Sequence, residues 1–265
     1  MGDPAFLVGC HRSGTTLARF LLDAHPRIAC PPESKFMAAL HAFYTYPQAL
    51  AALQSLGVDE ACVRREIRRV IETVMEGFAA RHGKARWIDK TPNYYRILPF
   101  LDDIFDGAAR FLFLARHPLD CAASLSTMYD GREPADPDIA RSIAARGRGL
   151  ASWCGYWAEV YGTVLDFYES RRERCLLLRY EDLVSNTGEA IGRALTFLGE
   201  SQPENLTASA FECPHTAGYE DAGIRRTCRV RTDRIGRWKL WPPADIDACW
   251  PAVSEIASRL RYDLT

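Results

Sequence analysis

Short apolar runs alternate with longer amphipathic segments along most of this 265-residue chain. Four of the runs have the length and composition of buried strands, at residues 5–10, 85–88, 110–115 and 175–178. Strands that alternate with helices are typical of βαβ units. The pattern therefore predicts an α/β fold with a parallel sheet flanked by helices.

The segments between these runs carry apolar residues at helical spacing. One such segment begins near Leu17, and a second spans residues 60–80. A third, rich in aromatic residues, predicts one long helix over about 143–172. The sequence shows no internal repeat and no low-complexity linker, and 265 residues suit one domain spanning 1–265.

The first apolar run leads into a turn of small residues, Gly9-Cys-His-Arg-Ser-Gly-Thr-Thr16, which precedes a helix. In such a layout, backbone N–H groups and a helix N-terminus point at the oxygens of a phosphate-like anion. Arg12 and the hydroxyls of Ser13, Thr15 and Thr16 add further donors. The turn is therefore a candidate anion site.

The turn resembles the Walker A motif in its glycine spacing but departs from it at one position. Gly9 and Gly14 match the pattern, whereas Thr15 stands where the lysine belongs. A kinase or ATPase would lose the cation that reaches its transferred phosphate. Here the positive charge lies inside the turn, at Arg12.

Polar residues also follow the other predicted strands. Ligands of parallel sheets bind beyond the carboxyl ends of the strands, so Lys90, Arg116 and Tyr180 are expected to converge on one crevice with the anion turn. Glu33 follows the first helix, where its carboxylate is placed to act as a base.

Composition narrows the function classes. The net charge of −1 argues against general nucleic-acid binding. No apolar run approaches the roughly 18 residues that span a bilayer, and the first residues lack a basic leader region, so we expect a cytoplasmic protein without a membrane partner. The nine cysteines show no C-x-x-C spacing, so we expect no metal site.

The segment Gly9-Cys-His-Arg-Ser-Gly-Thr-Thr-Leu17 resembles the 5′-phosphosulfate loop of sulfotransferases that use 3′-phosphoadenosine 5′-phosphosulfate (PAPS). Residues 12–26, together with Glu33, are similar to the tyrosylprotein sulfotransferases in particular. Further motifs of the family resemble Asp89-Lys90-Thr-Pro92, Arg116 with Ser124, Arg179-Tyr-Glu-Asp-Leu183 and Gly236-Arg-Trp-Lys239.

This resemblance implies a sulfotransferase fold, PAPS as co-substrate and no metal. It implies that Glu33 is the catalytic base and that Arg12 and Lys90 stabilise the transferring group. The cofactor contacts that it implies are Arg12, Ser13, Gly14, Thr15, Thr16, Arg116, Ser124, Tyr180 and Arg237.

Three of these assignments have structural alternatives. Arg116 can pair with Asp120 at a helix start, and Lys90 can pair with Asp89 at the surface. Tyr180 can contact the cofactor or simply pack at the start of the next helix. Basic residues also gather over 225–239, and their pairing with the family is open over 221–231.

The reaction expected from the resemblance is transfer of a sulfuryl group from PAPS to an acceptor hydroxyl. The favoured acceptor is a tyrosine of an acidic peptide, and a small-molecule phenol, alcohol or lipid is the alternative. Residues 36–58 and 129–150 are expected to supply acceptor loops. A non-catalytic nucleotide-binding module and a divergent kinase are the other hypotheses, and the family often forms homodimers.

Overall fold

The computed structural model describes residues 2–134, 136–218 and 229–265. In this part of the chain, five parallel strands form one sheet in the order β2-β3-β1-β4-β5. The strands are β1 (Ala5–Val8), β2 (Ile28–Ala29), β3 (Arg86–Lys90), β4 (Arg110–Ala115) and β5 (Cys175–Arg179). The predicted α/β fold is confirmed, and only the two-residue β2, too short to show periodicity, was not predicted.

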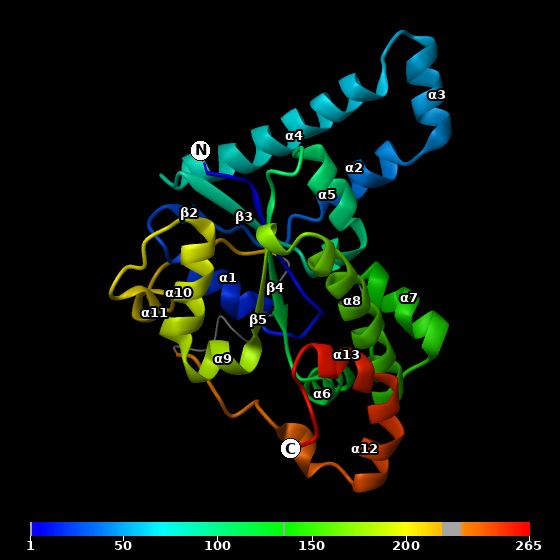
Figure 1. Cartoon of the computed structure of the whole chain (residues 1–265), viewed down its shortest axis with the longest axis vertical. Helices are drawn as coiled ribbons and strands as arrows, with labels where there is room; N and C mark the ends of the chain where they lie inside the picture. The colour runs from blue at the N-terminus through cyan, green and yellow to red at the C-terminus, as the bar shows by residue number, and fades with distance from the viewer. Residues whose placement is uncertain (1, 135, 219–228) are drawn as a thin grey trace.

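Helices cover both faces of the sheet (Figure 1). One face packs against α1 (Thr15–Asp23), α9 (Tyr180–Ser185), α10 (Thr187–Leu198) and α11 (Leu206–Ser209). The other is covered by α4 (Glu60–Arg81), α5 (Leu98–Ile104), α6 (Pro118–Tyr129) and α8 (Leu150–Ser170), and α12 (Pro243–Cys249) and α13 (Ser254–Arg259) pack against α8. Because strand side chains alternate, β1 sends Phe6 to one layer and Leu7 to the other.

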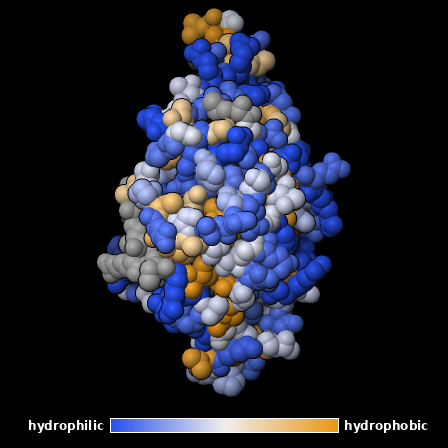
Figure 2. Space-filling model, turned by 90° about the vertical axis from the view of Figure 1, so that its left-hand side faces the viewer, coloured by the Kyte–Doolittle hydropathy of each residue, from blue (hydrophilic) through white to orange (hydrophobic). Residues whose placement is uncertain are grey.

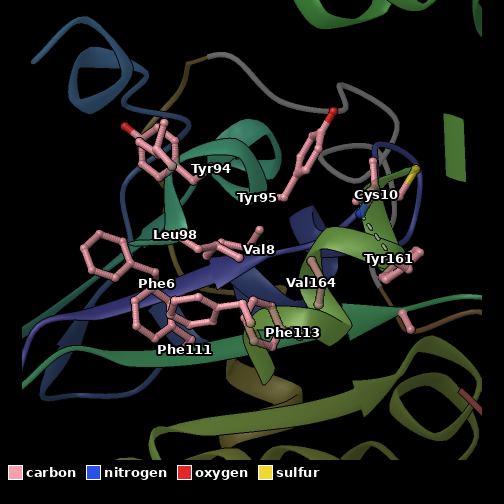
Figure 3. Packing of buried hydrophobic residues seen from close by; sticks show 14 of the residues in the cluster. Phe6, Val8, Cys10, Tyr94, Tyr95, Leu98, Phe111, Phe113, Tyr161 and Val164 are labelled. Atoms are coloured by element: carbon pink, nitrogen blue, oxygen red, sulfur yellow. Dashed lines mark hydrogen bonds between the residues drawn. The ribbon is translucent and has the colours of Figure 1, made fainter. Parts of the chain in front are cut away.

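Aromatic rings fill the layer between the sheet and α8. Phe6 stacks on Phe111 with ring centroids 5.5 Å apart, and Phe111 meets Phe167 edge-on at 4.8 Å. Figure 3 shows Phe6, Phe111 and Phe113 side by side under Val164 of α8. This packing fixes β1 and β4 against each other up to the ends where their loops begin.

The predicted long helix over 143–172 is wrong in its first part, because two helices occupy this region. Helix α7 (Pro137–Arg146) ends before Gly147, and α8 begins at Leu150. Gly147 and Gly149 have φ angles of 77° and 113°, a region of backbone space that favours glycine and cannot continue an α-helix.

The segments expected as acceptor loops are largely helical. Residues 36–58 form α2 (Phe36–Tyr44) and α3 (Pro47–Ser55), and residues 129–150 contain α7. Proline at the first turn of α3 and α7 favours a helix start, a signal that the sequence interpretation did not use.

Helices α2 and α3 and the start of α4 project from the body of the molecule as an arm (Figure 1). Figure 2 shows a mostly hydrophilic surface with a small hydrophobic tip at the end of this arm. Short 3₁₀ turns complete the fold, at Pro92–Ile97, Arg172–Arg174, Arg237–Leu240 and Trp250–Ala252. No helix among the described residues has both the length and the apolar character that a membrane crossing requires.

Candidate active site

The turn between β1 and α1 has a backbone shaped for an anion. Arg12 and Gly14 adopt positive φ angles of 69° and 96°, and the Ser13 N–H donates to the Cys10 carbonyl at 3.1 Å. Helix α1 begins directly afterwards at Thr15, and its N-cap, Gly14, has no side chain to cap the first amides. These amides therefore remain oriented toward any anion bound in the turn.

A tyrosine from α8 pins this turn to the end of β4. The hydroxyl of Tyr161 accepts a hydrogen bond from the Cys10 N–H at 3.2 Å and donates to the Leu114 carbonyl at 2.7 Å (Figure 3). Gly9 lies so close to Leu114 that a side chain there would meet its carbonyl oxygen. Among the described residues, the hydroxyl oxygen of Ser13 is buried without a hydrogen-bond partner, so the turn holds a polar atom that can bind a ligand.

Arg116 joins the end of β4 to this turn. Its guanidinium donates to the Arg12 carbonyl at 3.0 Å and to the Arg234 carbonyl at 2.7 Å. It also lies over the ring of Tyr180, 4.6 Å from the centroid. Arg116 is 5% exposed, and its Nε is buried with no hydrogen-bond partner in the part of the chain that the structure describes. A buried guanidinium with an unused donor is a strong site for an anion.

The alternative pairing of Arg116 with Asp120 is wrong within the described part of the chain. The Asp120 carboxylate instead accepts hydrogen bonds from the backbone N–H groups of Gly236 at 2.7 Å and Trp238 at 3.2 Å. These bonds hold the turn before the Arg237–Leu240 segment against the start of α6.

Tyr180 and Ser124 both lie beside the anion turn. Tyr180 is the first residue of α9, and its ring occupies the space that a side chain at position 14 would need. Ser124, in α6, accepts a hydrogen bond from Arg12 Nε at 3.0 Å. The structure thus brings both predicted residues to the turn, with Ser124 contacting Arg12 rather than Arg116.

Arg237 lies apart from this group. Its guanidinium is exposed and donates to the Asp233 carbonyl at 2.9 Å and to the Asp233 carboxylate at 3.2 Å. The neighbouring basic residues Arg225 and Arg226 lie outside the described residues.

Glu33 and Lys90 form a direct ion pair at the carboxyl end of β3. Lys90 Nζ donates to Glu33 Oε1 at 2.9 Å, the Lys90 side chain is fully buried, and Glu33 is 11% exposed. Lys90 does not pair with Asp89, which accepts hydrogen bonds from the hydroxyls of Ser34 and Thr91. Burial raises the pKa of Asp89 to about 6.

The carboxylate of Glu33 and the guanidinium of Arg12 act on a common neighbour, Tyr129 at the end of α6. Burial raises the pKa of Tyr129, Asp136 and Glu33 raise it further, and the positive charge of Arg12 opposes them. The carboxylate paired with the buried ammonium and the cation of the anion turn therefore both act electrostatically on Tyr129. Such an arrangement can deprotonate a hydroxyl beside a bound anionic donor.

Three residues near the pair were missed from the sequence: His11, Lys35 and Asp136. Lys35 Nζ lies 3.5 Å from Glu33 Oε2 and 3.0 Å from Asp136 Oδ2. The side chain of Asp136 also accepts the backbone N–H of Asp138 at 2.9 Å and so caps α7. The Asp-Pro pair at 136–137 signals such a cap, but nothing local to it indicates the contact with Lys35.

A family model described as "Sulfotransferase family" matches residues 4–204 of this chain. The nodulation protein NoeE of Sinorhizobium fredii is 30% identical over 91% of this chain and 57% of its own length, so the chain spans little more than half of that relative. Protein-tyrosine sulfotransferase 2 of Gallus gallus is 25% identical over 97% of this chain and 69% of its own length.

Two solved structures share the fold at lower sequence identity. The sulfotransferase domain from the curacin biosynthetic pathway superposes with a TM-score of 0.68 at 19% identity, covering 100% of this chain and 99% of that domain. Mouse sulfotransferase SULT7A1, solved in complex with PAP, gives a TM-score of 0.55 at 15% identity, covering 96% and 84% of the two chains.

We expect Gly14→Ala to destabilise the protein more than Gly57→Ala. Both glycines have positive φ, so each alanine carries a backbone cost of about 1 kcal/mol. Only at position 14 does the new methyl group also collide with the Tyr180 ring, whereas nothing lies within 4 Å at position 57. Urea denaturation should show an additional loss of roughly 1–3 kcal/mol for Gly14→Ala. Equal losses of unfolding free energy in the two variants would show that the β1–α1 turn accommodates the added methyl group without cost.

The buried Asp89 should make stability depend on pH. Its folded pKa of about 6 lies above the ordinary 3.8, so the folded state binds the proton more tightly than the unfolded chain. The resulting stabilisation is present below about pH 4 and is lost as the pH rises through 6. The unfolding free energy of the wild type, relative to Asp89→Asn, should therefore fall by about 2–4 kcal/mol between pH 4 and pH 7.

The matched control is Asp103→Asn, at an exposed carboxylate paired with Arg64. The difference in unfolding free energy between Asp103→Asn and the wild type should change by less than about 1 kcal/mol over the same pH range. Denaturant titrations at both pH values measure the two differences. A flat difference for Asp89→Asn would mean that Asp89 is ionised at pH 4 as well as at pH 7.

Proposed function

Because the chain belongs to the sulfotransferase family, we propose that it transfers a sulfuryl group from PAPS to an acceptor hydroxyl. The observation that carries this proposal is the Lys90–Glu33 ion pair, which places a carboxylate beside an anion turn that lacks the Walker lysine. A base for the acceptor and fixed cations for the donor are what such a transfer requires.

The residues of the turn fit the donor. Two buried polar atoms, Ser13 Oγ and Arg116 Nε, have no hydrogen-bond partner within residues 2–134, 136–218 and 229–265, and the α1 amides point into the same turn. PAPS supplies the activated sulfuryl group, and its product PAP is the nucleotide present in the mouse structure named above. We propose that the donor is held by Arg12, Ser13, Gly14, Thr15, Thr16, Arg116, Ser124, Tyr180 and Arg237.

We assign the proton transfer to Glu33. Its carboxylate accepts the hydroxyl proton of the acceptor, a step that typically contributes about 10²–10⁴-fold to the rate. Lys90, buried and hydrogen-bonded to Glu33 at 2.9 Å, holds the carboxylate in place. Lys90 and Arg12 also carry the positive charge that stabilises the transferring group and the oxygen that it leaves.

Two alternative functions are less well supported. A kinase would need the Walker lysine, and Thr15 occupies that position. A nucleotide-binding module without catalysis would have no need for a base and a buried lysine held 2.9 Å apart. Binding of ATP without binding of PAPS would favour the kinase.

We propose that the acceptor is the hydroxyl of a peptide tyrosine, with a small-molecule phenol, alcohol or lipid as the second candidate. Similarity to a protein-tyrosine sulfotransferase supports the first, and basic residues of the described C-terminal segment, such as Arg229 and Arg234, would attract an acidic peptide. The small-molecule acceptor remains the second candidate because the fold is shared with a sulfotransferase domain from a biosynthetic pathway.

We expect Glu33→Gln to lower kcat by about 100-fold or more while the dissociation constant for PAP changes by less than about twofold, because glutamine keeps an acceptor oxygen for Lys90 but cannot take up the proton of the acceptor hydroxyl. Arg116→Ala should do the reverse and weaken PAP binding by about tenfold or more. Calorimetry with PAP and a PAPS turnover assay measure the two effects. Full turnover in Glu33→Gln would remove Glu33 from the mechanism.

The acceptor is tested with acidic tyrosine peptides incubated with PAPS, using mass spectrometry and a parallel measurement of released PAP. Peptides with phenylalanine in place of tyrosine are the control. We expect sulfated tyrosine peptides and no product from the phenylalanine controls. If the protein binds PAP but no peptide is sulfated, PAPS remains the proposed donor and a small-molecule hydroxyl becomes the favoured acceptor.

A further inference from the structure

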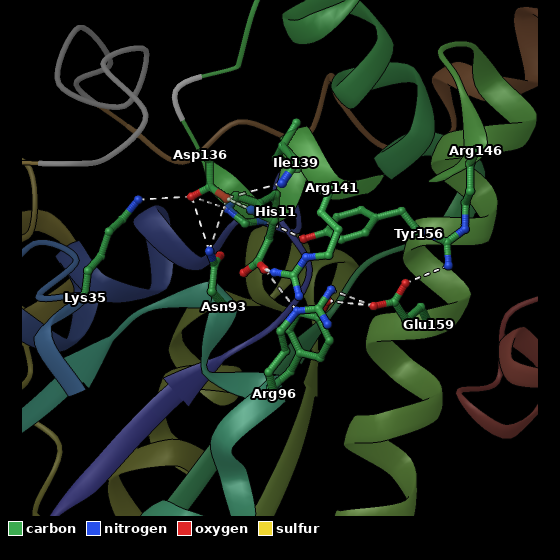
Figure 4. A network of polar contacts seen from close by, with 12 residues as sticks. His11, Lys35, Asn93, Arg96, Asp136, Ile139, Arg141, Arg146, Tyr156 and Glu159 are labelled. Carbon is green, nitrogen blue, oxygen red and sulfur yellow. Dashed lines mark hydrogen bonds and ion pairs between the residues drawn. The ribbon is translucent and has the colours of Figure 1, made fainter. Parts of the chain in front are cut away.

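Asp136 connects the candidate active site to α7, although it belongs to none of the motifs that identify the family. Figure 4 shows its carboxylate at the centre of a group of side chains from three other segments. His11 comes from the turn after β1, Lys35 from the segment before α2, and Asn93 from the segment after β3. Asp136 thus contacts the anion turn, the segment just after Glu33 and the segment just after Lys90, each of which contains or adjoins proposed active-site residues.

The contacts of Asp136 are close and shielded from water. Its side chain is 10% exposed and accepts hydrogen bonds from Lys35 Nζ at 3.0 Å and from Asn93 Nδ2 at 3.1 Å. His11 Nε2 lies 3.6 Å from Asp136 Oδ2. The other ring nitrogen, His11 Nδ1, is hydrogen-bonded to the Tyr156 hydroxyl at 2.7 Å. Burial opposes the ionised form, but His11 and Lys35 together hold the pKa of Asp136 well below its ordinary value.

Lys35 is shared between two carboxylates. Its Nζ lies 3.0 Å from Asp136 Oδ2 but 3.5 Å from Glu33 Oε2, so the stronger contact is with Asp136. Burial of Lys35 lowers its pKa, and the hydrogen bond and charge of Asp136, together with Glu33, raise it above the ordinary value. The ammonium group therefore stays charged, and Asp136 takes up part of the positive charge that would otherwise act on Glu33.

We propose that Asp136 is a positioning residue that draws Lys35 toward itself and so limits the positive charge that Lys35 places on the carboxylate of Glu33. This inference rests on the proposed function, in which Glu33 is the base. An ammonium group held fully against a carboxylate makes that carboxylate a weaker base. Glu33 has one ammonium partner in Lys90, at 2.9 Å, and Lys35 approaches its other carboxylate oxygen at 3.5 Å.

The other charged and titratable groups described near Glu33 come from two elements, β3 and α6. Lys90 and Asp89 lie at the end of β3, and Asp89 interacts electrostatically with Glu33. Tyr129 lies at the end of α6 and interacts with both Glu33 and Asp136. Of these groups, Asp89 titrates near pH 6, so its contribution must be common to every variant that is compared.

A purely structural role for Asp136, as the cap of α7, is separable by a matched control. Asp138 lies two residues further along, is equally shielded, and pairs with Arg96 at 3.0 Å and with Arg141. Neither Lys35 nor Glu33 is among its described partners. Asp138→Asn therefore perturbs α7 without touching the shared ammonium group.

The test is the acidic limb of the pH profile of kcat/KM in four variants. Asp136→Asn should move this limb to lower pH by about 0.5–1 unit, because the carboxylate that competes with Glu33 for Lys35 is then gone. Lys35→Met should move it to higher pH, because Glu33 loses a cation. The double variant should follow Lys35→Met, and Asp138→Asn should leave the limb in place.

Shifts in opposite directions for Asp136→Asn and Lys35→Met support the inference. Shifts in the same direction, or an equal shift in Asp138→Asn, overturn it and leave Asp136 as a helix cap. The same titrations are followed without turnover by carbon-13 NMR of the Glu33 carboxyl carbon, assigned with Glu33→Gln. Absence of turnover in the wild type would refute the proposed function, whereas the NMR shifts would still decide whether Asp136 controls Glu33.

Discussion

The rest of the site depends on the contact between the β1–α1 turn and the carboxyl end of β4. Gly9 lies against the Leu114 carbonyl, and Tyr161 bridges that carbonyl to the Cys10 N–H. Because β1 and β4 are neighbouring parallel strands, this contact fixes the anion turn relative to Arg116 at the end of β4. The aromatic layer under the sheet keeps both strands in place.

Buried charge is the second constraint. Lys90 is fully shielded from water, and an unpaired ammonium group there would carry a cost of several kcal/mol. Glu33 neutralises it, Lys35 approaches the other oxygen of Glu33, and Asp136 balances Lys35. A chain of alternating charges thus extends from β3 to α7, so a change at one end alters the electrostatics at the other.

Local signals in the sequence predicted much of the fold but failed where two signals competed. Four strands and the first helix follow from apolar runs and spacing. The aromatic periodicity behind the predicted helix over 143–172 begins only at Trp153, and the positive φ angles of Gly147 and Gly149 separate α7 from α8 before it. Residues 36–58 were expected as loops, although Pro47 and the alanines and leucines after it favour α3.

The sequence by itself determined the α/β class, the anion turn and the residues placed at strand ends, because these depend on short-range order along the chain. Only the tertiary structure decided which charges meet: that Lys90 pairs with Glu33, that Arg116 contacts the Arg12 carbonyl rather than Asp120, and that Arg237 turns to Asp233. Lys35 and Asp136 lie 101 positions apart. No local pattern records such a pair, because its formation depends on how the strands and helices pack.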